Sequence, residues 1–183
     1  IVCMFASIGG GLIVDGLFNE TLTVSGFAVF AGTALEMINA LGLIVIASVF
    51  FVVLKNKMPV VAVSYFALRA VEVAFCMVIA FAPVMLYRFT DTAATLMAVR
   101  AVFWDYVYAV IFSVSGFLFY LMIFKTSVIP KFIGLWGLVG LIGVFLSMFF
   151  PPAKMVFGVL IIANELFLGV YLIAKGIKNY NTV

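Results

Sequence analysis

Long, nearly uncharged apolar stretches constrain this sequence more than any other feature. They lie at about residues 1–14, 27–54, 60–86, 101–124, 132–150 and 155–174. The last five are long enough to cross a hydrocarbon layer of about 30 Å as helices, whereas the first is short for a span, and we expect it to be truncated at its start. Helices satisfy their own backbone hydrogen bonds, as lipid demands. The sequence therefore predicts an all-α polytopic membrane helix bundle of about six transmembrane helices, forming one integral membrane domain over residues 1–183.

Composition excludes a soluble domain and several kinds of site. Of the 183 residues, 68% are hydrophobic and 9% are charged, whereas soluble domains are about half apolar and a quarter charged. The chain has no histidine, so imidazole ligation of haem and histidine-based zinc sites are not available to it. Cys3 and Cys76 are isolated in apolar segments and form no metal-binding or redox motif. We therefore expect no cofactor and no metal.

Signatures of catalysis and of nucleic-acid binding are also absent from the sequence. There is no G-x-S-x-G motif, no phosphate-binding glycine loop and no cysteine cluster, and the predicted loops are too short for a soluble catalytic site. Basic residues form no run, so a nucleic-acid partner is not expected. We expect a protein that is not an enzyme.

The distribution of lysines predicts an orientation. One side of a six-helix alternation holds Lys55, Lys57, Lys125, Lys131, Lys175 and Lys178. The opposite side holds Asp15, Glu20, Arg88, Asp91, Arg100 and Lys154. Because cytoplasmic loops are enriched in Lys and Arg, we expect a multi-pass protein of the cell (inner) membrane with both termini in the cytoplasm.

Polar side chains inside the apolar stretches mark the candidate functional region. The predicted buried polar network consists of Glu36, Asn39, Arg69, Glu72, Asp105, Asn164 and Glu165. A charge at the bilayer centre costs roughly 2.5–3.5 kcal/mol, so these groups are expected to face one another, a partner or a water-filled cavity.

Two interpretations of this network remain open from the sequence. Arg69 and Glu72 are three residues apart and share a helix face, so they are able to pair. The four acidic groups still outnumber the single arginine, which predicts that some carboxyl groups are protonated, bound to a cation or bridged by water. The functional interpretation is a site that responds to protons or cations, with Glu72 and Glu165 as the deepest candidates. The structural interpretation is that the network joins four helices by hydrogen bonds.

Four glycines at strict three-residue spacing predict close helix packing in the fifth span. They are Gly134, Gly137, Gly140 and Gly143. Glycine allows the backbones of two membrane helices to approach closely. Three-residue steps drift around a helix by about 60° each, so this ridge is expected to spiral rather than stay on one face.

Three segments resemble a known bacterial family. The stretch Phe66-Ala67-Leu68-Arg69-Ala70-Val71-Glu72 is similar to its R-x-x-E signature, and residues 127–134 resemble its loop with a proline and a basic residue before a glycine-rich helix. Residues 164–172, followed by Lys175-Gly176, look like its last span, and Glu36 matches a further acidic position. The family is the multi-pass group known as domain of unknown function 4386. The resemblance covers about residues 27–178 and implies a multi-helix cell-membrane protein without an established activity.

Two classes of function follow from these observations. The first is a non-enzymatic accessory or structural subunit of a membrane assembly, favoured by the small size and the minimal surface outside the membrane. The alternative is a proton- or cation-coupled carrier of small solutes that works through buried carboxylates. The expected partners are membrane lipid and either other membrane protein subunits or further copies of this chain.

Overall fold

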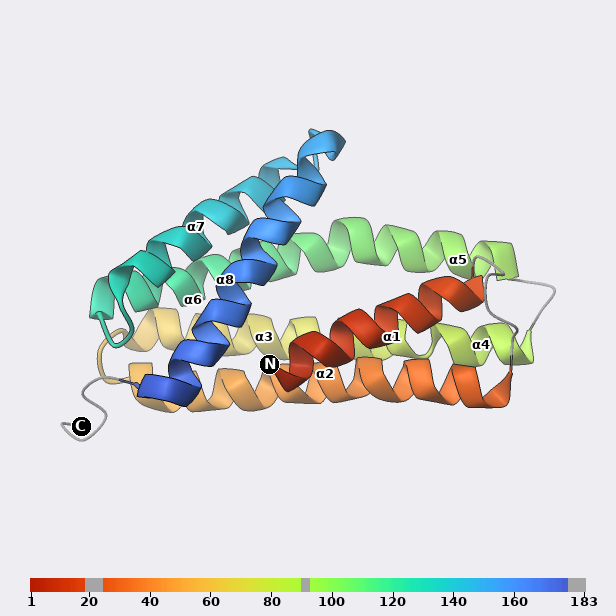
Figure 1. The fold of residues 1–183 in the computed structure, drawn as a ribbon, viewed down its shortest axis with the longest axis horizontal. Helices are drawn as coiled ribbons and strands as arrows, with labels where there is room; N and C mark the ends of the chain where they lie inside the picture. Colours follow the sequence, from red (N-terminus) through yellow and green to blue (C-terminus); the bar gives the residue numbers. More distant parts are fainter. Residues whose placement is uncertain (19–24, 90–92, 178–183) are drawn as a thin grey trace. The chain divides into compact units, whose positions relative to one another are not determined.

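The computed structural model describes residues 1–18, 25–89 and 93–177, and every regular element in these ranges is helical (Figure 1). The elements are α1 (Val2–Phe18), α2 (Gly26–Leu54), α3 (Pro59–Ala80), α4 (Ala82–Arg88), α5 (Ala93–Val102), η2 (Phe103–Tyr108), α6 (Ala109–Thr126), α7 (Lys131–Leu146), η3 (Pro151–Ala153) and α8 (Lys154–Lys175). The prediction of an all-α membrane bundle is confirmed. Glu20, Asp91 and Lys178, which entered the prediction of orientation, lie outside the described residues.

Four segments of the described chain are long and apolar enough to cross a membrane. They are Gly26–Leu54, Pro59–Met85, Ala98–Thr126 and Lys154–Lys175. The first and fifth predicted spans correspond to the shorter apolar helices Val2–Leu17 and Lys131–Leu146. The 16 residues of α7 measure about 24 Å, less than the thickness of the hydrocarbon layer. The sequence predicted a longer fifth span because the residues up to 150 are apolar, but the chain turns after Leu146, ahead of Pro151.

Prolines and a glycine set several helix ends. Pro59 opens α3 and Pro130 is the N-cap of α7, positions where the missing N–H of proline does least harm. Gly176 follows α8 with a φ of 67°, a conformation that glycine adopts without steric cost, and its N–H donates to the Leu172 carbonyl at 3.0 Å. The basic-glycine end expected for the last span is therefore a helix C-terminus.

The helices form two compact units. Unit 1 comprises Ile1, Ile46–Ala70 and Ala109–Val183, and unit 2 comprises Val2–Val45 and Val71–Tyr108. Helices α2 and α3 each contribute residues to both units.

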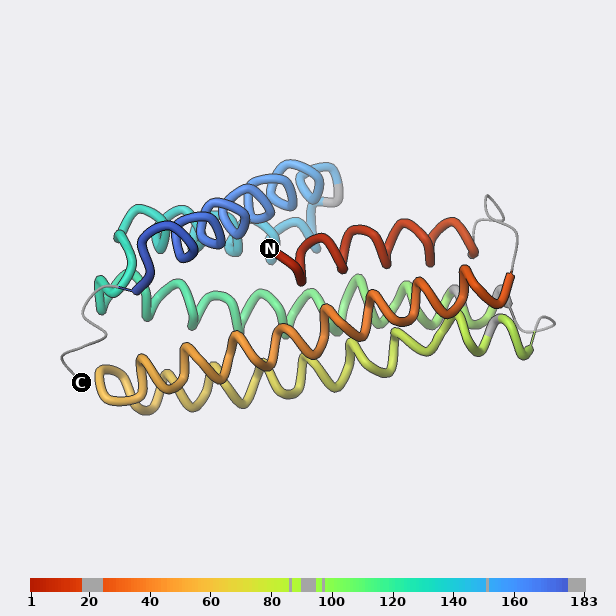
Figure 2. Tube along the Cα trace, turned by 60° about the horizontal axis from the view of Figure 1, so that its bottom comes forward, coloured from red at the N-terminus to blue at the C-terminus, as the bar shows by residue number. Residues whose placement is uncertain are grey.

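Unit 1 contains the larger apolar core. Buried side chains from α2, α3, α6, α7 and α8 form one cluster, which includes Tyr65, Phe119, Tyr120, Ile133 and Ile161. The Phe119 ring packs edge-on against Phe50 at 4.7 Å between centroids and is stacked with Tyr65 at 5.3 Å. The α2–α3 connection, the α6–α7 connection and the C-terminal end of α8 lie at one end of this unit (Figures 1 and 2). The predicted basic loops in the described part of unit 1 therefore share that end.

Unit 2 has smaller apolar clusters. One joins Val14 and Leu17 of α1 to Val29 of α2, and another joins Ala40 of α2 to Val73 and Cys76 of α3. The C-terminal ends of α1 and α4 and the N-terminal ends of α2 and α5 lie at one end of this unit (Figure 1).

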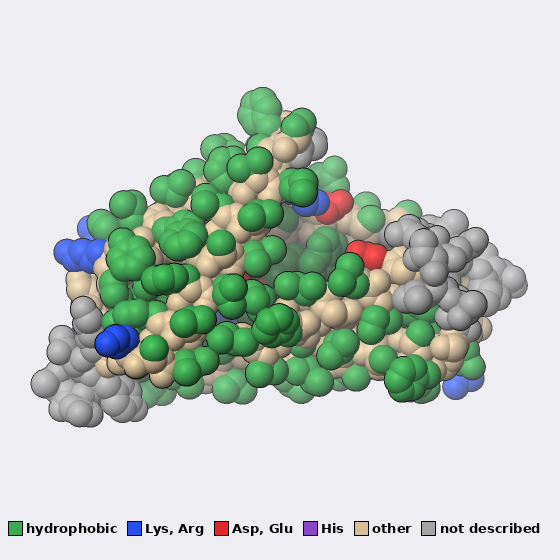
Figure 3. Space-filling view, viewed as in Figure 1, with side chains coloured by type: hydrophobic (Ala, Val, Ile, Leu, Met, Phe, Trp, Pro, Cys, Tyr) green, Lys and Arg blue, Asp and Glu red, His purple; other side chains and the backbone are tan. Residues whose placement is uncertain are grey.

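Apolar side chains also cover much of the surface of both units (Figure 3). Phe30 of α2 is 69% exposed and Ile173 of α8 is 77% exposed. In water an apolar surface this extensive would be strongly unfavourable, whereas lipid solvates it. The surface therefore fits a protein that contacts lipid on its helices.

Candidate functional site

A cavity of about 280 Å³ lies within unit 2. Its polar lining comes from Ser7 and Asp15 of α1, Glu36 and Asn39 of α2, Arg100 of α5 and Asp105 of η2. Cys76 and Ile79 of α3 and Trp104 of η2 also line it. The lining therefore contains three carboxyl groups and one guanidinium.

An ion pair joins Arg100 and Glu36 at this cavity. Arg100 Nη2 donates to Glu36 Oε1 at 2.6 Å, and Nη1 donates to Oε2 at 3.3 Å. The two side chains are 11% and 12% exposed, so water screens the pair only in part. Two parallel N–H···O bonds fix the relative orientation of the groups as well as their distance.

A break between α3 and α4 supplies Arg100 with a second acceptor. Arg100 Nη1 also donates to the backbone carbonyl of Ile79 at 3.1 Å. In a continuous helix this carbonyl would accept the N–H of residue 83, but Pro83 has no N–H, and its ring disfavours that contact. The helix is interrupted at Phe81, and α4 starts with proline in its first turn. Pro83 therefore leaves the Ile79 carbonyl available at the cavity wall.

A π-helical segment supplies another part of the cavity lining. In η2 the Trp104 ring stacks on Tyr108 with centroids 4.5 Å apart and planes inclined by 10°. The Arg100 guanidinium lies over the Trp104 ring at 5.9 Å, a cation–π arrangement. Single π turns inside α-helices occur frequently at functional sites. Trp104 and Asp105 both reach the cavity from this segment.

The cavity reaches the middle of the α2 segment that belongs to unit 2, residues 26–45. Glu36 is ten residues from the start of α2, which corresponds to about 15 Å along the helix axis. Arg100 is seven residues from the start of α5, about 10 Å. Asp15 is exposed, close to the C-terminus of α1, and acts electrostatically on Glu36. Asp105 is twelve residues from the start of α5, about 18 Å, so the acidic groups are spread along the helices rather than gathered at one end.

The structure divides the residues of the predicted polar network between the units. Glu36, Asn39 and Asp105 line the cavity of unit 2. Glu72 also belongs to unit 2, where its side chain is fully buried on α3 outside the cavity lining. The two glutamates considered deepest from the sequence, Glu72 and Glu165, are therefore not the ones at this cavity.

Unit 1 holds the remaining network residues. Asn164 is fully buried, and its Nδ2 donates to the Ile133 carbonyl of α7 at 3.0 Å. The Arg69 guanidinium lies 5.7 Å from the ring centroids of both Tyr65 and Phe112. Glu165 is partly buried on α8 and acts electrostatically on Tyr120 of α6. Arg69 and Asn164 are therefore buried within the helix packing, whereas Glu165 is only partly buried.

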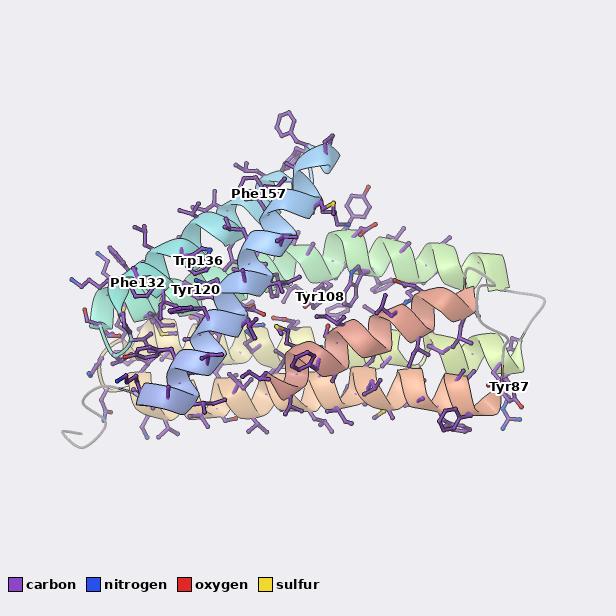
Figure 4. The ribbon with its side chains drawn as sticks, viewed as in Figure 1. Tyr87, Tyr108, Tyr120, Phe132, Trp136 and Phe157 are labelled. Atoms are coloured by element: carbon purple, nitrogen blue, oxygen red, sulfur yellow. The ribbon has the colours of Figure 1, made fainter. Side chains whose placement is uncertain are left out.

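The four glycines of α7 lie at two different helix contacts in unit 1. A Cβ on Gly134 would lie 2.9 Å from the backbone nitrogen of Phe124, and one on Gly137 would overlap the Tyr120 ring, both on α6. A Cβ on Gly140 would lie 3.2 Å from the Ile161 side chain, and one on Gly143 would overlap the Phe157 ring, both on α8. Tyr120 and Phe157 are labelled in Figure 4. The ridge therefore turns from α6 to α8 along α7.

Sequence reasoning missed Arg100 and Asp15 as site residues. Both were placed in the polar breaks, because the predicted spans ended at Val14 and started at Ala101. In the structure α1 extends to Phe18, and α5 begins at Ala93, so both charged residues are helical. The apolar residues that precede Arg100 from Ala93 onwards were the available signal.

The fold and the cavity define a helical multi-span membrane protein with charged groups inside one of its compact units. Residues 1–176 match the family model of the domain of unknown function DUF4386. The chain belongs to this family. Neither the curated proteins nor the solved structures give a match. Within the described residues, no group of three or more Cys, Asp or Glu side chains is arranged to hold a metal ion.

Proposed function

We propose that this protein is a membrane carrier that binds a small organic cation in the cavity of unit 2. One observation carries the proposal: three carboxyl groups and only one guanidinium line this cavity. A largely apolar surrounding strengthens the interaction of these charges with a cation. An anion would meet the same carboxyl groups at a net electrostatic cost.

The size and walls of the cavity support a small solute. A volume of about 280 Å³ is below the 300–1,000 Å³ typical of sites for drug-sized ligands. Trp104 adds an aromatic wall, which favours organic cations through their attraction to the ring face. Interrupted helices that offer backbone carbonyls at a binding site are a recurring feature of membrane carriers, and the α3–α4 break is of this kind.

Cys76 provides a test of the binding part of this proposal, because its side chain lines the cavity. In a Cys3→Ala background, Cys76 is the remaining cysteine of the chain. We expect it to react at least tenfold faster with a trimethylammonium methanethiosulfonate than with the sulfonate analogue, after each rate is normalised to that of a free thiol. Equal normalised rates would contradict a cation-selective cavity.

Uptake into proteoliposomes tests the transport part. Vesicles containing the full chain should accumulate labelled methylguanidinium above protein-free vesicles, and Glu36→Gln should lower the rate at least tenfold. Asn164→Ala, in unit 1, is the matched control and should retain uptake. Uptake equal to that of empty vesicles would reject the carrier.

The accessory-subunit hypothesis has separate support in unit 1. Asn164 and Arg69, both at least nine-tenths buried, contact backbone or aromatic groups within the packed helices. Such contacts serve helix packing without any ligand. Native mass spectrometry of the gently solubilised protein tests this second candidate. Stoichiometric co-purification with another membrane protein would support it, whereas a lone chain or homo-oligomer would favour the carrier.

The proposed location is the cell membrane, with both termini in the cytoplasm. Lys55, Lys57, Lys125, Lys131 and Lys175 all belong to the end of unit 1 that holds the α2–α3 and α6–α7 connections, as the positive-inside rule would have it for a cytoplasmic face. Binding and release of a cation require no covalent chemistry, so the proposed role is not enzymatic.

A further inference from the structure

The groups that contact the Arg100 guanidinium are also able to bind an external organic cation. This guanidinium contacts a carboxylate, a backbone carbonyl and an indole ring, from Glu36, Ile79 and Trp104. These three kinds of group are the general means by which proteins recognise guanidinium and ammonium ligands. All of them line the same cavity.

The Ile79 carbonyl is the least expected member of this set, and its availability is built into the fold. An interior helical carbonyl normally accepts the N–H four residues later. Pro83 removes that donor, and the chain breaks between α3 and α4 at the same place. The acceptor is therefore present whether or not Arg100 uses it.

We propose that Glu36, the Ile79 carbonyl and Trp104 form a recognition site for guanidinium and primary ammonium compounds, and that Arg100 is a tethered internal ligand of this site. An external cation binds by displacing the Arg100 guanidinium from Glu36. This inference rests on the proposed cation-binding function of the cavity and names its ligand class and its competitor.

Displacement makes a quantitative prediction. When an internal group occupies a site for most of the time, the apparent affinity for an external ligand falls by the fraction of time for which the site is open. Removal of Arg100 should therefore tighten the binding of an external guanidinium. Asp15 and Asp105 place two further carboxyl groups at the same cavity.

The test compares methylguanidinium binding by the full-length Cys3→Ala protein with and without Arg100→Ala, measured as protection of Cys76 from a neutral thiol reagent. We expect the apparent Kd to fall at least tenfold in Arg100→Ala and to an intermediate value in Arg100→Lys. Glu36→Gln should abolish protection in both backgrounds. Urea, which is similar in shape but uncharged, should give no protection. An unchanged or weaker affinity in Arg100→Ala would overturn the inference.

A second variant tests the contribution of the Ile79 carbonyl to cation binding. Pro83→Ala returns an N–H to position 83, which then competes for the Ile79 carbonyl. In the Arg100→Ala background it should weaken methylguanidinium binding several-fold, and an unchanged Kd would remove Ile79 from the site.

Folding of Arg100→Ala is itself informative, since the variant leaves Glu36 without its cation. Its melting temperature should rise in millimolar methylguanidinium chloride and not in tetramethylammonium chloride of equal ionic strength. If Arg100→Ala does not fold under any condition, the Kd of Arg100→Lys decides, and a value equal to that of the parent protein overturns the inference.

The outcomes also separate this inference from the carrier proposal. Charge-selective labelling of Cys76 without a gain in affinity on loss of Arg100 would reject the internal ligand and keep the cation cavity. Tighter methylguanidinium binding in Arg100→Ala without uptake into vesicles would keep the binding site and reject transport.

Discussion

In unit 1 the buried polar groups are embedded in tight packing, whereas in unit 2 they face a cavity. Asn164 of unit 1 is fully buried and bonds to a backbone carbonyl of the neighbouring helix. Glu36 and Arg100 of unit 2 form a partly exposed ion pair beside a volume of about 280 Å³. Polar residues in apolar helices therefore need not have one common role within a chain. Their surroundings decide whether they join helices or bind a solute.

The same contrast extends to the backbone. In unit 1 the glycines of α7 allow close contacts with Tyr120 and Phe157, and the helix remains regular from Lys131 to Leu146. In unit 2 the helices are interrupted at Phe81 and widened over Phe103–Tyr108. Trp104 and Asp105 of the widened segment line the cavity, and the interruption follows Ile79, which also lines it. Close side-chain packing therefore characterises unit 1. In unit 2 a break in the helix leaves a backbone carbonyl, that of Ile79, to accept a side-chain hydrogen bond.

The largest effect is expected from a bulky side chain at the glycine ridge of unit 1. Gly143→Leu must displace the Phe157 ring, because even a Cβ at this position would overlap it. We expect a loss of about 3 kcal/mol or more in the free energy of unfolding, measured by denaturant titration in detergent.

Gly158→Ala on α8 is the matched control for this variant, since a Cβ there meets nothing within 4 Å. Its unfolding free energy should be unchanged or raised by up to about 1 kcal/mol. Equal stabilities of the Gly143→Leu and Gly158→Ala proteins would show that the ridge does not organise unit 1.

A double-mutant cycle on Glu36 and Arg100 tests the charged pair of unit 2. Each single change to Gln leaves a largely buried charge uncompensated and should cost about 3 kcal/mol in unfolding free energy. The double variant should lose less than either single variant, which corresponds to a coupling of about 3 kcal/mol or more. Asp15→Asn, which removes an exposed carboxylate near Glu36, should not destabilise the protein. Additive losses at Glu36 and Arg100 would contradict a direct pair.

Asn164→Ala should have the smallest effect of the three. The variant loses one hydrogen bond to the Ile133 carbonyl, which corresponds to about 1 kcal/mol in unfolding free energy. Methylguanidinium protection of Cys76 should be unchanged, because Asn164 belongs to unit 1. A loss of protection would mean that packing and cation binding are not divided between the two units.

Much of the fold was predictable from the sequence, because hydrophobic length and proline positions act locally. The apolar runs predicted the helices, and three-residue spacing predicted a glycine ridge that turns around α7. The site was less predictable. Glu36, Asn39 and Asp105 were identified as charges or amides in apolar runs, but the partner of Glu36 was not, since Arg100 is 64 residues away.

Two local features prevented the sequence from predicting that partner. The predicted fourth span began one residue after Arg100, so its guanidinium was assigned to the water phase. Pro83 interrupts the helix locally, but the consequence for the Ile79 carbonyl depends on which side chain lies beside that carbonyl, here Arg100. Such a contact is set by tertiary structure rather than by periodicity.

The order in which the glycines of α7 meet their neighbours has a consequence for changes in chain length. Gly134 and Gly137 contact α6, whereas Gly140 and Gly143 contact α8. One residue inserted between Gly137 and Gly140 would rotate the second pair by about 100° relative to the first. Every original side chain would be retained, yet α7 would no longer match both neighbours. In this helix the register between distant positions is constrained more strictly than the identity of the residues between them.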